Sequence, residues 1–201
     1  MKSMRRMLLA VTIAAFTVGC GSDSTGPGGD EGLSGSMSFT YSGALSGTFS
    51  ANGKFTGNLE SSLNAGSLTI GFRHPENGQF GVNGYDITSG TRGNMAVMVF
   101  EGTEKGRYTP GVGAECEPRC AAVFLYFNLD MGGGAQVPGN DTRTFVFETG
   151  EFNVTELDSK VVKGTFSGTA VEFLGTAELT ITNGTFSAPI IPAFPGAGGI
   201  N

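Results

Sequence analysis

The stretch Ala177-Glu178-Leu179-Thr180-Ile181-Thr182-Asn183-Gly184-Thr185-Phe186-Ser187-Ala188 decides the fold class. Leu179 and Ile181 alternate with polar residues, which is the two-residue period of a β-strand with one buried and one solvated face. The apolar positions are odd-numbered up to Ile181 and even-numbered from Phe186 onward. We therefore expect a bulge or a tight turn at Asn183-Gly184 to absorb the change of phase.

The same period recurs from Leu33 onward, and outside the N-terminal segment no twelve residues show apolar positions at helical spacing. The runs Met95–Phe100 and Ala121–Phe127 are apolar on both faces, as in central strands or short buried helices. Their length, their β-branched and aromatic content and the flanking glycines favour central strands. Glycine accounts for 34 of 201 residues, far above the usual ~7%. We therefore predict an all-β domain of about ten short strands, an antiparallel β-sandwich or an open barrel. The expected turns are at Asn52-Gly53, Asn77-Gly78, Asn83-Gly84, Gly132-Gly133-Gly134, Pro138-Gly139-Asn140-Asp141 and Leu157-Asp158-Ser159.

One tetrapeptide, Gly-Thr-Phe-Ser, occurs three times, at positions 47–50, 164–167 and 184–187. Its spacing is irregular, which excludes a solenoid of fixed period. We interpret it as one type of strand used repeatedly, with the phenylalanine facing inward.

The N-terminus has the features of an export signal. Lys2, Arg5 and Arg6 form a basic region, and Met7–Val18 is an apolar run of 12 residues. A run of this length is too short to span a bilayer as a helix, which needs about 20 residues. The alternative to the lipoprotein described next is an ordinary signal peptide followed by an incidental cysteine.

The segment Thr17-Val18-Gly19-Cys20 resembles the lipobox of bacterial lipoproteins, although Thr17 stands where that motif usually has leucine. The resemblance implies cleavage before Cys20 and acylation of its thiol and its new amino group, by palmitate or a similar chain. Gly21 follows the cysteine in place of the aspartate that commonly signals inner-membrane retention, so the resemblance implies the outer membrane. Two or more acyl chains would give stable anchoring.

The chain divides into four parts. Residues 1–19 are the predicted signal peptide, and residues 20–32 are a Gly/Ser-rich segment with no apolar side chain after Cys20 until Leu33, which predicts a flexible tether. The all-β domain covers residues 33–189. Residues 190–201, with Pro192 and Pro195 among several glycines, predict a flexible tail.

The C-terminal third of the chain resembles a family of uncharacterised bacterial lipoproteins. The resemblance lies in Lys160–Gly168, which contains Val162-Lys163-Gly164-Thr165-Phe166-Ser167-Gly168, and in Glu178–Phe186, which ends Ile181-Thr182-Asn183-Gly184-Thr185-Phe186. It is specific over residues 153–189. The family implies a signal, a lipidated cysteine, a tether and one β-sandwich-like domain of unknown function. It implies no site residues.

Three cysteines are present. If Cys20 is acylated, Cys116 and Cys120 remain as a pair in an oxidising compartment, and the Glu-Pro turn between them predicts a local disulfide. Free thiols and a metal site are the alternatives. A metal would need at least two more ligands, and His74 is the only histidine.

The charge of the chain limits its partners. The formal net charge is −6, and removal of residues 1–19 takes away three basic residues and no acid, which leaves 9 basic and 18 acidic residues and a net charge of −9. An acidic surface repels phosphate, so we expect no nucleic-acid partner and no broad electrostatic attraction to anionic lipid.

No group of residues predicts catalysis, and we expect no catalytic residues, no metal and no cofactor. His74 lies in a predicted loop without a nucleophile elbow. Glu148 with Glu151 or Glu156 is the carboxylate pair that glycoside hydrolysis would use, but acids are common on solvated strand faces.

Neither a calcium site nor a tryptophan platform for sugars is predicted. Calcium ligands at Asp130, Asn140 and Asp141 lack the 12-residue loop pattern of calcium sites. Tryptophan, on which sugars often stack, is absent. The phenylalanines are expected in the core, and the tyrosines are the better candidates for an exposed aromatic platform. The tyrosines are Tyr41, Tyr85, Tyr108 and Tyr126.

Our first functional hypothesis is a non-enzymatic envelope lipoprotein, attached to the membrane through Cys20, that binds an unknown envelope or extracellular ligand. We expect the binding loops at one end of the sandwich, at Gly102–Cys120, because the cysteine pair would stiffen them. The alternative is a carboxylate-dependent hydrolase of envelope polysaccharide, which would need two acids about 5–10 Å apart in one cleft. A purely structural role in the envelope is a third hypothesis.

Overall fold

The computed structural model describes residues 33–74, 77–89, 92–111, 119–131, 138–139 and 141–191, which form ten strands and one short helix. The elements are β1 (Leu33–Gly43), β2 (Gly47–Phe55), α1 (Leu59–Asn64), β3 (Leu68–Arg73), β4 (Phe80–Ser89), β5 (Arg92–Glu101), β6 (Gly106–Pro110), β7 (Cys120–Asp130), β8 (Arg143–Leu157), β9 (Val161–Glu172) and β10 (Glu178–Pro189). The predicted signal peptide and tether lie outside these ranges. Within them, no helix has the length and apolar character needed to cross a membrane.

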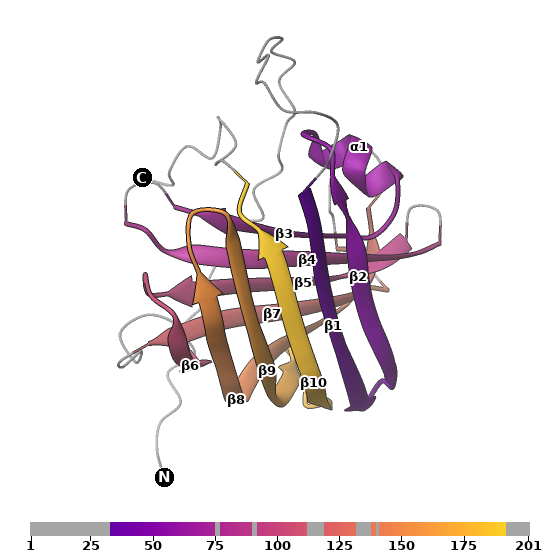
Figure 1. Cartoon of the computed structure of the whole chain (residues 1–201). Coiled ribbons are helices and arrows are strands. Elements are labelled where there is room, and N and C mark those ends of the chain that lie inside the picture. Colours follow the sequence, from indigo (N-terminus) through magenta and orange to yellow (C-terminus); the bar gives the residue numbers. More distant parts are fainter. Residues whose placement is uncertain are drawn as a thin grey trace.

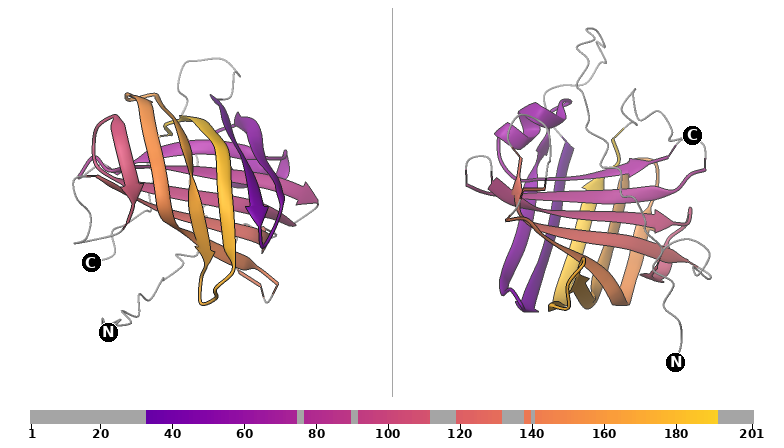
Figure 2. Two further views of the ribbon diagram at one scale, coloured as in Figure 1. Left: turned by 90° about the horizontal axis from the view of Figure 1, so that it is seen from below. Right: turned by 180° about the vertical axis from the view of Figure 1, so that it is seen from behind.

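The ten strands form a single sheet in the order β2-β1-β10-β9-β8-β6-β7-β5-β4-β3, which is not closed into a barrel. The sheet folds over on itself. A layer of β1, β2, β8, β9 and β10 runs across a second layer of β3, β4, β5 and β7 (Figure 1, Figure 2). Paired strands are antiparallel except β6 and β7. The predicted all-β, sandwich-like fold is confirmed.

Strand β8 belongs to both layers. Its first residues, from Arg143 to Val146, pair with β7, and Phe152–Val154 pair with β6. Its other edge pairs with β9 along most of its length, with register shifts at Phe147/Thr149 and Val154/Glu156. A strand of 15 residues is about 50 Å long, and bulges bend a strand, so β8 can pass from one layer to the other.

Aromatic side chains fill the space between the layers, as the composition predicts. The rings of Phe80 and Phe100 are stacked with centroids 4.7 Å apart, and Tyr108 meets Phe100 edge-on at 5.1 Å. Phe39 and Phe49 form another stacked pair at 4.7 Å. Such pairs add about 0.5–1.5 kcal/mol to the free energy gained by burial. The predicted central strands are confirmed, because β5 pairs with β4 and β7, and β7 pairs with β5 and β8.

The Gly-Thr-Phe-Ser copies place their phenylalanines inward, as predicted: Phe49, Phe166 and Phe186 are 1%, 4% and 3% exposed. The second and third copies pair with each other in opposite directions across β9 and β10. The pairs are Gly184 with Phe166, Thr185 with Thr165, and Phe186 with Gly164. The register shift between Ile181 and Gly184 confirms the predicted bulge.

Two predicted turns are wrong. Asn52-Gly53 lies inside β2, and Asn83-Gly84 lies inside β4. A Cβ atom at Gly53 would be 1.8 Å from the carbonyl oxygen of Ser67, and one at Gly84 would be 2.8 Å from the sulfur of Met37. These glycines allow the two layers to approach each other closely, a role that sequence alone does not separate from a turn.

A smaller apolar cluster lies on the outer face of β3 and β4. Leu68, Ile70 and Tyr85 are buried there, and Leu59 and Leu63 of α1 pack against them. The sequence does not predict α1, which has six residues and is too short for a helical pattern to emerge. Its first turn is capped by a neighbouring side chain, since Asn58 Oδ1 accepts a hydrogen bond from the Ser61 backbone N–H at 2.9 Å.

The domain continues past its predicted end at residue 189. Ile190 forms a parallel bridge with Gly71, and the Ile191 backbone N–H donates to the carbonyl of Gly71 at 3.0 Å. The Ile191 side chain is 2% exposed in the smaller cluster. Residues 190 and 191 therefore belong to the fold, and the rest of the predicted tail lies outside the described residues.

Candidate ligand-binding face

The outer face of the layer formed by β1, β10, β9 and β8 is lined with short polar side chains. The strands alternate, so the residues between the buried ones face outward. Most of them carry a hydroxyl or an amide and are exposed or half-buried. The hydroxyl and amide residues are Ser34, Ser36, Ser38, Thr40 and Ser42 of β1, Thr180, Thr182, Thr185 and Ser187 of β10, Thr165, Ser167 and Thr169 of β9, and Thr149, Asn153 and Thr155 of β8. The other outward residues include Val146, Glu151, Val161, Lys163, Val171 and Glu178.

The strand register aligns these side chains in rows. One row crosses five strands, from Ser50 through Ser38, Thr185 and Thr165 to Asn153. Neighbouring strands in a sheet are about 4.8 Å apart, so the row presents donors and acceptors at a regular spacing. The hydroxyl oxygens of Ser38 and Thr185 are within hydrogen-bond distance at 3.1 Å.

A shallow hollow of about 380 Å³ lies in the middle of this face. It is lined by Glu151, Thr165, Phe166, Ser167, Asn183, Gly184 and Thr185. The bulge in β10 helps to form it, because Thr182 and Asn183 are both exposed where a regular strand would turn one of them inward. Asn183 has a φ of 55°, which asparagine tolerates better than most residues.

The hollow also has a charged edge. Glu151 lies opposite Ser167 in the register, and its carboxylate is 3.3 Å from a guanidinium nitrogen of Arg107 on β6. The two side chains are 45% and 77% exposed, so the pair is open to solvent. An exposed pair of this kind contributes little to stability, about 0–1 kcal/mol, and both groups can bond to a ligand.

A second hollow of about 510 Å³ lies at the end of β8. Its lining residues come from the β5–β6 turn and from the last residues of β8. They are Thr103, Glu104, Lys105, Thr155, Glu156 and Leu157. Thr155 also belongs to the outward row of β8, so both hollows lie along this strand.

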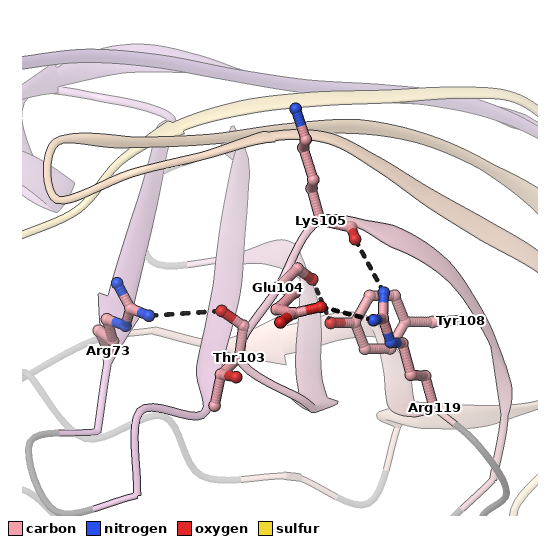
Figure 3. Close-up of polar contacts among 6 residues, drawn as sticks. All are labelled: Arg73, Thr103, Glu104, Lys105, Tyr108 and Arg119. Carbon is pink, nitrogen blue, oxygen red and sulfur yellow. Dashed lines mark hydrogen bonds and ion pairs between the residues drawn. The ribbon is translucent and has the colours of Figure 1, made fainter.

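Arg119 holds the β5–β6 turn that forms one wall of the second hollow (Figure 3). Its guanidinium is 2.7 Å from the Glu104 carboxylate and donates to the carbonyl of Lys105 at 2.8 Å. The Tyr108 hydroxyl donates to the carbonyl of Glu104 at 2.5 Å, and Arg73 donates to that of Thr103 at 3.4 Å. The Glu104 carboxylate and the backbone carbonyls of Thr103, Glu104 and Lys105 are thus all bonded to side chains outside the turn. The Lys105 ammonium points away from Arg119 (Figure 3).

Within the loop face predicted at Gly102–Cys120, the structure describes residues 102–111, 119 and 120, which include this turn. The prediction is wrong for Gly106–Pro110, which form strand β6 and pair with β7 and β8. The sequence assigned the stiffness of the face to the cysteine pair. Cys120 is disulfide-bonded, whereas Cys116, its predicted partner, and Cys20 lie outside the described residues. Arg119, the neighbour of Cys120, also fixes the β5–β6 turn through its bonds to Glu104 and Lys105. Nothing in the sequence predicts this role for an arginine.

The acids considered for hydrolysis do not meet in one place. Glu151 pairs with Arg107 at the first hollow, and Glu156 lines the second hollow, where it is 2.8 Å from the Lys163 ammonium. Glu148 is exposed on β8. Glu104 and Glu156 do line the same hollow, but each is bound to a basic side chain.

The remaining candidates from the sequence are separate. His74 follows β3, where its backbone bonds to Gln79 and Gly78 in the turn before β4. The calcium candidates Asp130 and Asp141 are described, and Asn140 is not. Among the described residues, no three His, Cys, Asp or Glu side chains gather closely enough to hold a metal ion.

The prediction of an exposed tyrosine platform is wrong. Tyr85 and Tyr108 are 3% and 0% exposed, and Tyr41 and Tyr126 are half-buried. Burial raises the pKa of Tyr126 and, as the largest effect, that of Tyr108. A tyrosine side chain can serve either a buried or an exposed role, and here the rings of Tyr41, Tyr85 and Tyr108 pack in the two apolar clusters.

Comparison of the chain with protein-family models, curated proteins and solved structures finds no match. The resemblance of the C-terminal third to uncharacterised lipoproteins therefore stays a prediction.

Proposed function

We propose that this protein is a lipid-anchored component of the bacterial cell envelope whose β-domain binds a polyhydroxylated ligand, an envelope glycan, without catalysis. The observation that carries the proposal is the hollow on the hydroxyl-lined face, where Thr165 and Thr185 stand opposite each other between Glu151 and Asn183. Glycan hydroxyls both donate and accept hydrogen bonds, and so do the threonine and serine side chains that line this face.

The charge of the domain favours an uncharged ligand. The net charge of −9 expected for the chain after residue 19 repels anions but has little effect on a neutral sugar. The Glu151 carboxylate is a stronger hydrogen-bond acceptor than a hydroxyl, and the Asn183 amide can both donate to and accept from sugar hydroxyls.

A rigid sheet suits a repetitive ligand. The hydroxyls are held on strands that pair with a neighbour on each side, so little conformational entropy is lost when a ligand binds. Each hydrogen bond is worth only about 0.5–1.5 kcal/mol net. A polymer that contacts both hollows along β8 gains affinity through the second contact, because that contact is intramolecular.

The predicted lipid on Cys20 supports glycan binding in the cell envelope. An acylated Cys20 would tether the domain to the outer membrane, within reach of envelope glycans. A tether of Gly-rich composition permits the domain to sample orientations relative to a polymer.

Binding is tested by sedimentation with chitin, an insoluble and uncharged polymer of N-acetylglucosamine. The wild-type chain is expected to sediment with the chitin. The double variant Thr165→Val/Thr185→Val removes two hydroxyls from the hollow and keeps the branched shape that strands favour, so we expect about a tenfold loss of affinity. The matched control is Thr40→Val/Thr48→Val, an opposed pair on β1 and β2 outside the hollow.

The control pair is expected to bind as the wild type does. If the wild type does not sediment with chitin, the proposed class of ligand, an uncharged glycan, is wrong. If both double variants lose the same affinity, the hollow is not the binding site.

Anchoring is tested separately. We would measure the intact mass and the membrane partitioning of the chain expressed in a Gram-negative host, with Cys20→Ser as control. The wild type is expected to carry acyl mass and to float with outer membrane, and the variant to lose both. A soluble and unacylated wild type would contradict the anchor and leave the glycan experiment unaffected.

A further inference from the structure

The β9–β10 turn carries two apolar side chains into solvent. Phe173 is 50% exposed and Leu174 is 94% exposed. The only other large apolar side chain exposed in the described part of the chain is Leu33, which is 46% exposed. A nearly complete exposure of leucine beside an exposed phenylalanine is uncommon on a domain that buries its other described phenylalanines at least partly.

The backbone of this turn is also unusual. The Gly175 N–H donates to the carbonyl of Glu172 at 3.0 Å, which makes Phe173 and Leu174 the two central residues of a β-turn. Leu174 has a φ of 62°, in the left-handed region that glycine and asparagine adopt most readily. Gly175 is the next residue, yet leucine occupies the strained position. Strain of this kind is often retained at functional sites.

The base of the turn is held firmly. The Phe173 N–H donates to the carbonyl of Thr144 at 2.7 Å, which attaches the turn to the start of β8. Arg143 on β8 is 2.7 Å from the Glu172 carboxylate, and its guanidinium also donates to the carbonyl of Ala44 in the β1–β2 turn at 3.4 Å. The acid beside the two apolar residues is therefore neutralised by a neighbouring cation.

We propose that Phe173 and Leu174 form a membrane-contact prong, whose side chains enter the apolar region of a lipid bilayer. A bilayer accepts isolated apolar side chains without a complementary pocket, which suits a turn that projects only two of them. Burial of each side chain is worth roughly ten- to hundredfold in affinity, so the contact is weak for a free protein. It becomes effective for a tethered one, because the tether raises the effective concentration of the membrane.

The length of the chain permits this contact together with a lipid on Cys20, and in this respect the inference rests on the proposed anchor. Gly43, at the end of β1, pairs with Leu179 near the β9–β10 turn, so the prong lies at the opposite end of β1 from Leu33 (Figure 1). Strand β1 has 11 residues and is about 36 Å long. The 13 residues from 20 to 32 can span up to about 45 Å, which exceeds that length.

The contact is tested with a fluorescent reporter at the prong. The chain contains no tryptophan, so the fluorescence of the Leu174→Trp variant reports position 174 alone. The chain is tethered by an N-terminal histidine tag to a nickel-chelating lipid in phosphatidylcholine vesicles whose acyl chains carry bromine, which quenches tryptophan on contact. We expect quenching and a blue shift. The control is Asn52→Trp on the exposed outer face of β2, which pairs with Ser36 toward the other end of β1 and is expected to show neither.

A second pair of variants separates contact from folding. Asparagine adopts a positive φ more easily than leucine, so Leu174→Asn is expected to fold at least as stably as the wild type. In the Phe173→Trp background, Leu174→Asn is expected to remove most of the quenching. Both readouts report the turn itself, so they stay interpretable if Cys20 proves to carry no lipid.

Two results would overturn the proposal. One is Leu174→Trp fluorescence that bromine-labelled vesicles leave unchanged, which would also be the outcome if the prong fits a pocket on a partner protein. The other is a Leu174→Asn variant that is less stable than the wild type, because Leu174 would then serve the fold.

Discussion

The ring of Phe186 occupies the space that a side chain at Gly164 would need. A Cβ atom on Gly164 would lie 2.5 Å from Cζ of Phe186, its partner on the neighbouring strand. The same relationship holds between Gly184 and Phe166, the next paired positions of this kind, with the strands exchanged. A Cβ atom on Gly184 would lie 2.7 Å from ring carbons of Phe166. Each Gly-Thr-Phe-Ser copy thus supplies the glycine that the phenylalanine of the other copy covers. Their threonines, which face the opposite way, meet in the proposed binding hollow.

The substitution Gly164→Ala tests this packing. Its methyl group would also be 2.5 Å from the carbonyl oxygen of Asn153, so both a side chain and the backbone would have to move. We expect the free energy of unfolding to fall by about 1–3 kcal/mol, as for other overpacked cores. Urea unfolding measures this. Gly139→Ala is the control, because no atom lies within 4 Å of its added Cβ, and an equal loss in both variants would contradict the packing argument.

The hydroxyl of Tyr108 is expected to stabilise the β5–β6 turn. Tyr108 is fully buried and donates to the carbonyl of Glu104, so Tyr108→Phe leaves that carbonyl without its partner. We expect a loss of about 0.5–1.5 kcal/mol in the free energy of unfolding. Tyr126→Phe is the control, since the described residues offer its hydroxyl no hydrogen-bond partner. A Tyr108→Phe protein as stable as the control would show that the hydrogen bond adds nothing net.

The ion pair between Arg143 and Glu172 should make stability depend on pH. The hydrogen bond and the charge of Arg143 lower the pKa of Glu172 below its usual 4.5. A lowered carboxyl pKa stabilises the fold above the unfolded value of 4.5, and the effect is lost as the pH falls through the folded value. We therefore expect Glu172→Gln to be less stable than the wild type at pH 7, with the difference closing below about pH 4.5.

Thermal unfolding across this pH range measures the difference. Glu148→Gln serves as the control, because Glu148 is exposed and has no ion pair within the described part of the chain. A gap between Glu172→Gln and wild type that is the same at pH 7 and at pH 3 would rule out the ion pair as its cause.

The sequence predicted the strands well because alternation is a local signal. The bulge at Asn183-Gly184 and the central positions of Met95–Phe100 and Ala121–Phe127 follow from which residues are apolar. The strand order is not local. β1 and β10 pair although Ser38 and Thr185 are 147 residues apart, so the hydroxyl rows become visible only when the sheet is assembled.

The two candidate surfaces differ in what the sequence could reveal. The alternation in the repeats predicts that their threonines face outward. The hollow between these threonines depends on the pairing of Thr165 with Thr185, which the sequence does not show. The sequence contains no signal for the positive φ of Leu174, because glycine, the usual residue for that conformation, stands one position later as Gly175. The sequence wrongly predicts turns at Gly53 and Gly84. Both glycines are needed for close packing against residues distant in sequence, which a local pattern does not reveal.

Asp86 should produce a pH dependence opposite in sign to that of Glu172. Asp86 lies on β4, opposite Asn94 on β5. Partial burial raises the pKa of Asp86 above 3.8, although hydrogen bonds from the Ser50 backbone and the Asn94 side chain act in the opposite direction. A raised carboxyl pKa means that the folded state holds the proton more tightly, so this group makes the protein less stable as the pH rises through 3.8 to the folded value. Asp86→Asn resembles the protonated form and does not titrate. The melting temperature of the variant relative to wild type should therefore rise between about pH 3.8 and the folded pKa and then level off. A relative stability that falls over this range would mean that the hydrogen bonds to the carboxylate outweigh its burial.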